Sequence, residues 1–306
     1  MKTFRTQILL SGRLGTPLIG DTLFGHVAWG IARREGEPAL QSFLASVKKE
    51  AAFVISSAFP EGHIPVPILA PHEKTTSNVE EYNKIKKRKK VRYIPFDLFS
   101  APCKINGDTI IKASETQKYA EYKRQVLHNS VDRFGSGTLD EVGLFKGTEY
   151  WYSSDLTNKH RQAKMDVYIA SGFDAARIKT ILGYAFESGY GARASTGAGN
   201  IRLLSLSEVD MPKSGKRAMA LGPFVPSKNN TPENLRADIF VRLGKLGYEL
   251  GSKMNPFKKP LLMYAEGSSF DKPGNASIIG SLVEGIHGDR RIVHQAMAPI
   301  ICFDEE

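Results

Sequence analysis

Apolar and polar residues alternate at the start of the chain. Phe4, Ile8 and Leu10 occupy even-numbered positions, and Arg5, Gln7 and Ser11 occupy odd-numbered ones. A two-residue period is typical of a strand that buries one face. The sequence therefore predicts a half-buried N-terminal strand.

A helix is predicted directly after residues 12–20. Asp21 is of a residue type that often accepts the first free N–H groups of a helix, so it is the expected N-cap. Beyond it, apolar residues recur at three- and four-residue steps, at Leu23, Phe24, Val27, Ala28 and Ile31. The chain thus opens with a strand followed by a helix.

The next segment, residues 36–124, shows no clear period. Four prolines interrupt it before a basic run: Pro60, Pro65, Pro67 and Pro71. Proline cannot donate to a sheet ladder or continue a helix. We therefore interpret this segment as a large insertion.

Strand-like patterns resume between residues 126 and 170, where we expect a hairpin with a long connection. Asp174 is the expected N-cap of a second helix, whose apolar residues recur at helical spacing as far as Ala185. A glycine-rich loop, residues 188–199, then leads to a strand at residues 200–206. This order, β-α-β-β-α-β, predicts an α+β fold with a ferredoxin-like (RRM-like) domain over residues 1–208.

Residues 209–306 are predicted to form a second, β-rich domain. Strand signals occur near residues 217–225, 237–243, 260–266 and 292–303, and helical spacing is poor. We interpret this region as a candidate degenerate copy of the ferredoxin-like domain.

The positive charge of the chain indicates a class of binding partner. The chain has 42 Lys and Arg against 32 Asp and Glu, a formal net charge of +10, as expected of a phosphate-binding protein. Seven of the nine residues 84–92 are cationic, among them Lys86, Lys87 and Arg88. This run is either a solvated loop or a clamp on an RNA backbone. The apolar runs are short, so we expect a cytoplasmic protein with no membrane span.

The glycine-rich loop is the sharpest local signal. Gly189, Gly191, Gly197 and Gly199 bracket three polar residues: Arg193, Ser195 and Thr196. Glycines permit a positive φ, so N–H groups can turn toward a phosphate, and an arginine adds a charged contact. The glycines follow a helix and precede a strand, which argues against a dinucleotide site. The alternatives are a phosphate-binding loop and a plain flexible connection.

Two further segments carry candidate RNA contacts. Asn129 and Arg133 suit sugar and phosphate contacts, or a hydrogen-bonded strand edge. His294 and Gln295 suit phosphate or the Watson–Crick edge of an unstacked base. His26 is either a general base for RNA cleavage or, as we favour, a packed or hydrogen-bonded histidine.

The remaining histidines and the two cysteines show no ligand spacing. The pattern HExxH is absent, and Cys103 and Cys302 lie far apart without a CxxC motif, so we expect packing cysteines. We therefore predict neither a metal nor another cofactor, and no catalytic residue.

Four segments together resemble the RAMP superfamily of CRISPR proteins. They are residues 15–31 (GTPLIGDTLFGHVAWGI), 128–138 (HNSVDRFGSGT), 189–203 (GYGARASTGAGNIRL) and 291–299 (RIVHQAMAP). Within the superfamily, they are most similar to the Cas5-group subunits that bind the 5′ tag of the guide RNA in type III-A Csm complexes. The family loop often carries an aspartate before Ser-Thr-Gly, where this chain has Ala194, which puts any role of that acid in doubt.

The resemblance implies a non-catalytic assembly role. Such a subunit holds the crRNA 5′ tag, caps the backbone filament of RAMP (Cas7-type) subunits and docks the large palm-domain (Cas10-type) subunit. Target RNA is then engaged indirectly, through base pairing with the guide. The alternatives are the equivalent type III-B subunit, a guide-processing RAMP endoribonuclease and a generic basic scaffold.

Overall fold

A four-stranded antiparallel sheet forms the centre of the first part of the chain. In this computed structural model the described residues are 1–71, 79–99, 104–115, 119–129, 143–155, 162–227, 231–247, 250–251 and 254–306. The strand order is β2-β8-β1-β9, with β1 Lys2–Leu10, β2 Phe53–Pro60, β8 Ala163–Ser171 and β9 Ile201–Glu208. The predicted N-terminal strand and the strand after the glycine loop therefore lie side by side.

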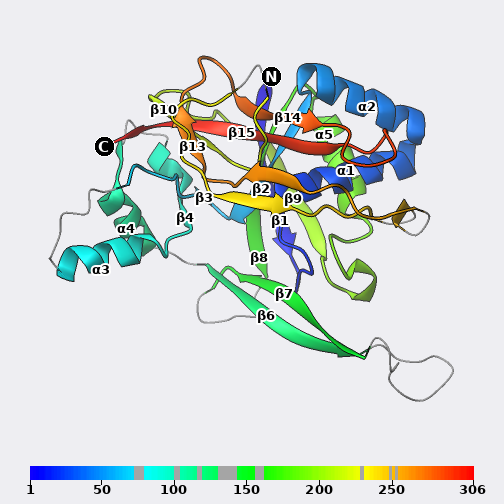
Figure 1. Ribbon diagram of the computed structural model, residues 1–306, viewed down its shortest axis with the longest axis horizontal. Helices are drawn as coiled ribbons and strands as arrows, with labels where there is room; N and C mark the ends of the chain where they lie inside the picture. The colour runs from blue at the N-terminus through cyan, green and yellow to red at the C-terminus, as the bar shows by residue number, and fades with distance from the viewer. Residues whose placement is uncertain are drawn as a thin grey trace.

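Three helices cover one face of this sheet (Figure 1). They are α1 Gly20–Glu35, α2 Glu37–Glu50 and α5 Ala175–Phe186. Their apolar faces pack on the sheet because burying aliphatic and aromatic surface is favourable. The predicted cap of α5 is confirmed, since the Asp174 carboxylate accepts the N–H of Arg177 at 2.7 Å.

The predicted cap of α1 is wrong. The helix begins at Gly20, Ile19 occupies the N-cap position, and Asp21 lies within the first turn. The Asp21 side chain is buried and faces Arg242 and His294 from the C-terminal half of the chain. An ion pair across the fold thus replaces the expected local hydrogen bond.

The interpretation of residues 36–124 as an insertion needs correction at its start. This segment contains α2 and also β2, which is an edge strand of the central sheet. Every residue of β2 is buried, so its sequence lacks the alternation of a half-exposed strand. Between residues 126 and 170 a hairpin is formed by β6 Ala120–Asn129 with β7 Leu144–Ser153, as a separate two-stranded ribbon that begins before the predicted range. The strand after the predicted long connection at residues 153–162 is β8, which joins the central sheet instead of pairing with β7.

The rest of that segment builds a second core on the other face of the central sheet. Its elements are β3 His63–Pro65, α3 Val79–Arg88, β4 Tyr93–Pro95, the 3₁₀ helix η1 Phe96–Phe99, β5 Lys104–Ile105 and α4 Gly107–Glu115. This core joins Phe59 and Tyr168 of the central sheet to Ile94, Met219 and Ile301. Both faces of β2 and β8 are therefore covered.

Strands dominate the described residues beyond 209. They are β10 Arg217–Ala220, β11 Ile239–Arg242, β12 Leu261–Tyr264, β13 Ser269–Asp271, β14 Ile278–Val283 and β15 His294–Glu305. Four of them form a sheet in the order β13-β10-β15-β14, and β5 adds to it beside β15. Because the second core draws residues from both sides of position 209, the domain boundary there stays a prediction.

One end of the central sheet carries the features that matter for function. Leu10 pairs with Ala163 and Ile201, and Pro60 pairs with Met165. These strand ends therefore lie at the same end of the sheet, and the β6–β7 hairpin projects from that end away from the body (Figure 1). The glycine loop enters β9 at the same end.

Candidate nucleic-acid interface

The glycine loop folds back on itself with a left-handed backbone at several positions. Gly189, Gly191, Gly197 and Gly199 all have positive φ, and Arg193 does too, with φ of 65°. At Gly199 an added Cβ would overlap the carbonyl of Tyr190. At Gly197 the space is open, so only the backbone conformation favours glycine there.

Most N–H groups of this loop donate inside the protein. Tyr190 donates to the Gly199 carbonyl at 2.9 Å, Ala192 to Thr16 Oγ1 at 3.0 Å, and Gly199 to the Arg13 carbonyl at 2.8 Å. Those of Arg193, Ala194 and Ser195 form no hydrogen bond with the described residues. Of the N–H groups predicted to face phosphate across residues 189–199, those of residues 193–195 are therefore the ones available for it.

The tip of the loop is a short 3₁₀ turn, Ala194–Thr196. Ser195, Thr196 and Gly197 are exposed there. The Thr196 hydroxyl donates to the Arg193 carbonyl at 3.1 Å, whereas Ser195 presents its hydroxyl to solvent. Two predicted contacts, the Ser195 side chain and the N–H groups of this turn, are thus placed together.

Arg193 is half-buried and reaches the hairpin. Its guanidinium contacts His128 Nε2 on β6 and lies against Gly147 on β7. Because a guanidinium only donates, the His128 nitrogen is the acceptor. Arg193 therefore joins the glycine loop to the hairpin, and its predicted phosphate contact stays a prediction.

Arg13 is a second connection that the sequence did not indicate. Its Nε lies 3.3 Å from the buried Glu149 carboxylate on β7, and its Nη2 donates to the Thr196 carbonyl at 3.2 Å. The neighbouring Leu14 pairs with Tyr150 through two backbone hydrogen bonds of 2.9 Å. Loop, β1–α1 connection and hairpin base thus form one connected unit.

His26 supports the loop from below. Its Nε2 accepts the Gly191 N–H at 3.0 Å, and its ring lies 4.7 Å from that of Tyr190. Burial, with a smaller contribution from the charge of Arg33, lowers the pKa of His26 to about 4, so the ring is neutral near pH 7. The packed, hydrogen-bonded interpretation of His26 is confirmed, and the lone pair that a general base would use is occupied.

The β6–β7 hairpin combines cations with aromatic rings. Tyr122 and Trp151 stack across it with ring centroids 6.1 Å apart, and Lys123 lies over Tyr150 at 5.6 Å. Exposed apolar side chains continue toward its end: Leu127, Leu144 and Phe145. Aromatic rings beside cations are what single-stranded nucleic acids bind. Asn129 ends β6 opposite Leu144, and Arg133 lies outside the described residues.

The first part of the basic run, residues 84–88, belongs to a helix rather than a loop. Lys86, Lys87 and Arg88 occupy the last turn of α3, in which no residue is buried. In Figure 1, α3 lies beside α4 on one side of the molecule, away from the end of the hairpin. The structure thus does not bring these cations to the glycine loop.

His294 and Gln295 are interior residues of β15 rather than surface contacts. His294 Nε2 lies 3.2 Å from Asp21 Oδ2, and Gln295 Nε2 donates to the Phe53 carbonyl at 3.4 Å. Their exposed fractions are 7% and 2%. Both join β15 to the first half of the chain, so the predicted surface for an RNA base is not formed by them.

Asp21 is the centre of that buried polar cluster. Arg242 Nε lies 2.6 Å from its Oδ2 as an ion pair. Burial acts to raise the pKa of Asp21, but the hydrogen bond with His294 and the charge of Arg242 outweigh it, so the pKa lies below its ordinary value. Asp21 is therefore ionised at neutral pH and holds α1 to the C-terminal strands.

Three kinds of feature are missing from the part of the chain that the structure describes. No three His, Cys, Asp or Glu side chains gather as a metal ion would require. No described helix has the length and apolar character to cross a membrane. No disulfide is formed by Cys302, which packs as a free thiol in the core of the second sheet, while Cys103 lies outside these residues.

Comparisons with known proteins identify the fold. No family model matches the sequence, and no curated protein matches it. Among solved structures, a Csm1–Csm4 cassette with AMPPNP matches at 16% identity and TM-score 0.58, over 100% of this chain and 99% of that chain. The same cassette with pppApA gives 15% and 0.57, with the same coverage.

A third structure comes from a different assembly. The Csm3–Csm4 subcomplex of a type III-A interference complex matches at 13% identity and TM-score 0.53, over 97% of this chain and 99% of that chain. Csm4 is the component common to all three assemblies. The chain therefore has a Csm4-like fold along its whole length.

Proposed function

We propose that this chain is the non-catalytic subunit that binds the 5′ tag of the guide RNA in a type III-A CRISPR effector complex. The observation that carries the proposal is the full-length likeness to Csm4, which covers nearly all of both chains. A fold shared at this identity does not by itself determine function. The surface chemistry at the end of the central sheet supplies the second argument.

That surface has the parts that a single-stranded RNA needs. The loop tip offers the Ser195 hydroxyl and N–H groups that form no hydrogen bond with the described residues, and the adjoining hairpin offers stacked aromatic rings and cations. The chain's net charge of +10 favours association with phosphate. We infer that the tag runs between loop and hairpin, with phosphate held at the turn of residues 193–195.

The partners follow from the neighbours of Csm4 in the solved structures. Csm1 and Csm3 accompany Csm4 there, so we infer that the corresponding palm-domain and backbone subunits bind this chain. The guide then reads target RNA by base pairing, while this protein holds one end of the guide.

We also infer that the central sheet is a ferredoxin-like unit. Its strands follow the chain order β1, β2, β8 and β9, with helices after β1 and after β8, and they lie in the order β2-β8-β1-β9. This split arrangement, with every neighbour antiparallel, is the one expected of a β-α-β-β-α-β unit. Its open end then presents the glycine loop.

Guide binding and guide cleavage are separated by one pair of measurements. We expect filter binding to give at least about tenfold tighter affinity for RNA bearing the tag than for RNA with a scrambled tag, a difference of roughly 1.4 kcal/mol. Equal affinity for both would indicate a generic basic scaffold. Cleavage of repeat RNA by the isolated chain, abolished in His26→Ala, would instead identify a guide-processing endoribonuclease.

Addition of a chelator tests the absence of a cofactor. We propose that binding needs no metal, so EDTA should leave the affinity for tagged RNA unchanged. Loss of binding that Mg²⁺ or Zn²⁺ restores would contradict this part of the proposal.

A further inference from the structure

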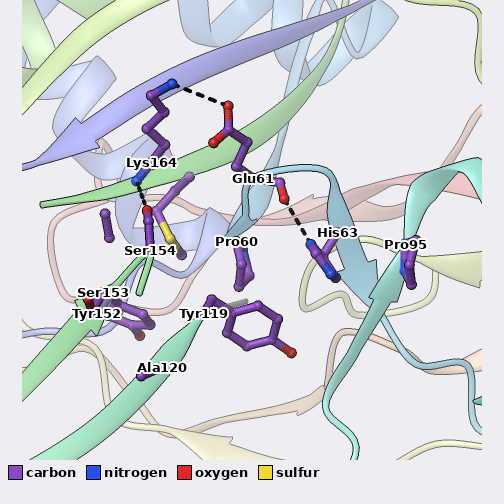
Figure 2. A pocket seen from close by; sticks show the side chains of 12 residues that line it. Pro60, Glu61, His63, Pro95, Tyr119, Ala120, Tyr152, Ser153, Ser154 and Lys164 are labelled. Atoms are coloured by element: carbon purple, nitrogen blue, oxygen red, sulfur yellow. Dashed lines mark hydrogen bonds and ion pairs between the residues drawn. The ribbon is translucent and has the colours of Figure 1, made fainter. Parts of the chain in front are cut away.

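A cavity of about 420 Å³ lies beside the base of the hairpin, apart from the glycine loop. Figure 2 shows its lining, which includes Pro60, His63, Tyr119, Tyr152 and Lys164. Four of these residues lie on β2, β3, β7 and β8, and Tyr119 directly precedes β6. The cavity thus forms where the central sheet meets the hairpin.

Its walls are flat and largely apolar. The Tyr119 ring is held by two neighbours, with the His63 ring edge-on at 5.1 Å and the Tyr93 ring at 5.6 Å. Pro60 and Pro95 add two more flat surfaces to the lining (Figure 2). Aromatic rings already fixed in place can stack on a planar ligand at little cost in conformational entropy.

The charged and polar side chains of Glu61, His63 and Lys164 also line the cavity. His63 Nδ1 lies 2.8 Å from the Glu61 carbonyl, and since a carbonyl only accepts, Nδ1 carries the proton and Nε2 remains as an acceptor in the neutral ring. The Glu61 carboxylate lies 3.5 Å from Lys164 Nζ (Figure 2). Acceptors and a cationic donor at the edge of a flat apolar space match the hydrogen-bonding edge of a nucleobase.

The position of the cavity relates it to the RNA path proposed above. The glycine loop enters β9, the hairpin adjoins the end of β1, and the cavity lies at the ends of β8 and β2. Because the strand order is β9-β1-β8-β2, the glycine loop, the hairpin and the cavity lie in that order along the same end of the sheet. Three inter-strand spacings amount to about 14 Å, a distance that a few nucleotides of extended RNA can cover.

We propose that this cavity binds one unstacked nucleobase of the guide RNA, stacked against Tyr119 with its polar edge toward Glu61, His63 and Lys164. The inference rests on the proposed function for the identity of the RNA. It adds a base-binding pocket to the phosphate-binding turn and the aromatic hairpin proposed above. A base bound in this cavity no longer stacks on its neighbouring bases, so we expect the RNA backbone to turn at that nucleotide.

The experiment compares variants of the full chain. Tyr119→Leu removes the stacking ring, and His63→Leu removes an acceptor together with one of the two rings that hold Tyr119. His287→Leu is the matched control, because His287 also bonds a carbonyl, that of Asn255 at 2.9 Å, but does not line the cavity. We expect the Kd for tagged guide RNA to rise about fivefold to 150-fold in Tyr119→Leu, to rise less in His63→Leu and to stay constant in the control.

Ultraviolet crosslinking followed by mass spectrometry gives an independent readout. We expect one nucleotide of the guide to crosslink to Tyr119, Tyr152 or His63 in the unmodified chain. Tag-specific binding with no crosslink here, and with both variants equal to the control, would overturn the pocket and leave the proposed function standing. Unchanged guide affinity with loss of a partner subunit would identify a protein occupant and likewise overturn it.

Mononucleotides test the pocket if the proposed function itself fails. Each of AMP, GMP, CMP and UMP is added to the isolated chain, and saturation-transfer NMR measures contact with base protons. Transfer to base protons that disappears in Tyr119→Leu supports a base pocket even without tag-specific binding. Absence of transfer for all four nucleotides, in a chain that also fails to select the tag, overturns both proposals.

Discussion

The glycine loop and the Asp21 cluster show two ways in which this chain holds polar residues. In the loop, backbone geometry fixes the chain and leaves Ser195 exposed. In the cluster, the buried Asp21 carboxylate fixes the buried His294 and the partly exposed Arg242. Similar residue types in the sequence therefore face solvent in one place and hold the fold together in the other. Substitutions should separate the two, with the largest effects on stability at the cluster.

The largest effect is expected for Asp21→Ala. It leaves the buried His294 and the partly exposed Arg242 without their anion, at a cost of about 3 kcal/mol. Urea denaturation should show a lower midpoint with little change in slope. Asp289→Ala is the control, because Asp289 forms its ion pair with Arg291 at the surface. Equal stability of the two variants would mean that the cluster contributes nothing to the fold.

The loop glycines come next. Gly199→Ala forces a Cβ onto the Tyr190 carbonyl at a positive φ. We therefore expect the free energy of unfolding, measured by urea denaturation, to fall by about 1–3 kcal/mol, and guide binding to weaken. Gly197→Ala meets open space and should cost about 1 kcal/mol or less. The bulkier Gly197→Val is the stronger test of close RNA approach at that position. If Gly197→Ala and Gly199→Ala behave alike, steric contact does not distinguish the two positions.

Arg193→Ala tests whether the connection between loop and hairpin matters for RNA. Loss of a well-ordered charged hydrogen bond is worth about 1.5–3 kcal/mol, and less where water reaches it. We expect weaker guide binding with a nearly unchanged circular dichroism spectrum and melting temperature. A guide affinity equal to that of the parent chain would show that the hairpin stays in place without Arg193.

The α3 cations are expected to have a smaller, salt-dependent effect. Replacing Lys86, Lys87, Arg88 and Lys89 together by alanine should lower guide affinity and make its dependence on salt shallower. The slope of log affinity against log salt is the measurement. An unchanged slope would place α3 outside the RNA path.

The smallest effect concerns acid. Asp21 has a folded pKa below its ordinary value of 3.8, so its contribution is complete above that pH and is lost as the pH falls through the folded pKa. Unfolding free energy should therefore decline more steeply below about pH 4 in the parent chain than in Asp21→Asn. Parallel curves would mean that Asp21 is not ionised in the folded protein.

The sequence predicted best what local chemistry decides. Helix α5 was predicted from Asp174 and a regular apolar spacing, and the loop that follows from its glycines. Both depend on residues within a few positions of each other. The short period of the first strand was equally informative, because only one of its faces needed to be apolar.

Distant contacts were out of reach of the sequence. β2 has no alternation because both of its faces are buried, and Pro60 at its end, with the prolines that follow the strand, favours an irregular segment. Asp21 was assigned a local cap because its partner Arg242 lies 221 residues away. The cavity is lined from strands spread over a hundred residues of sequence, so no spacing could indicate it.

Gly147 has a genetic consequence. The Arg193 guanidinium fills the space where any side chain at position 147 would begin, and the tip of an arginine can move aside. Gly147→Ala should therefore displace Arg193 from His128 without altering a single charge. A shorter residue at position 193 should act as a second-site suppressor of clashes at 147, and the two positions are expected to change together as the protein diverges.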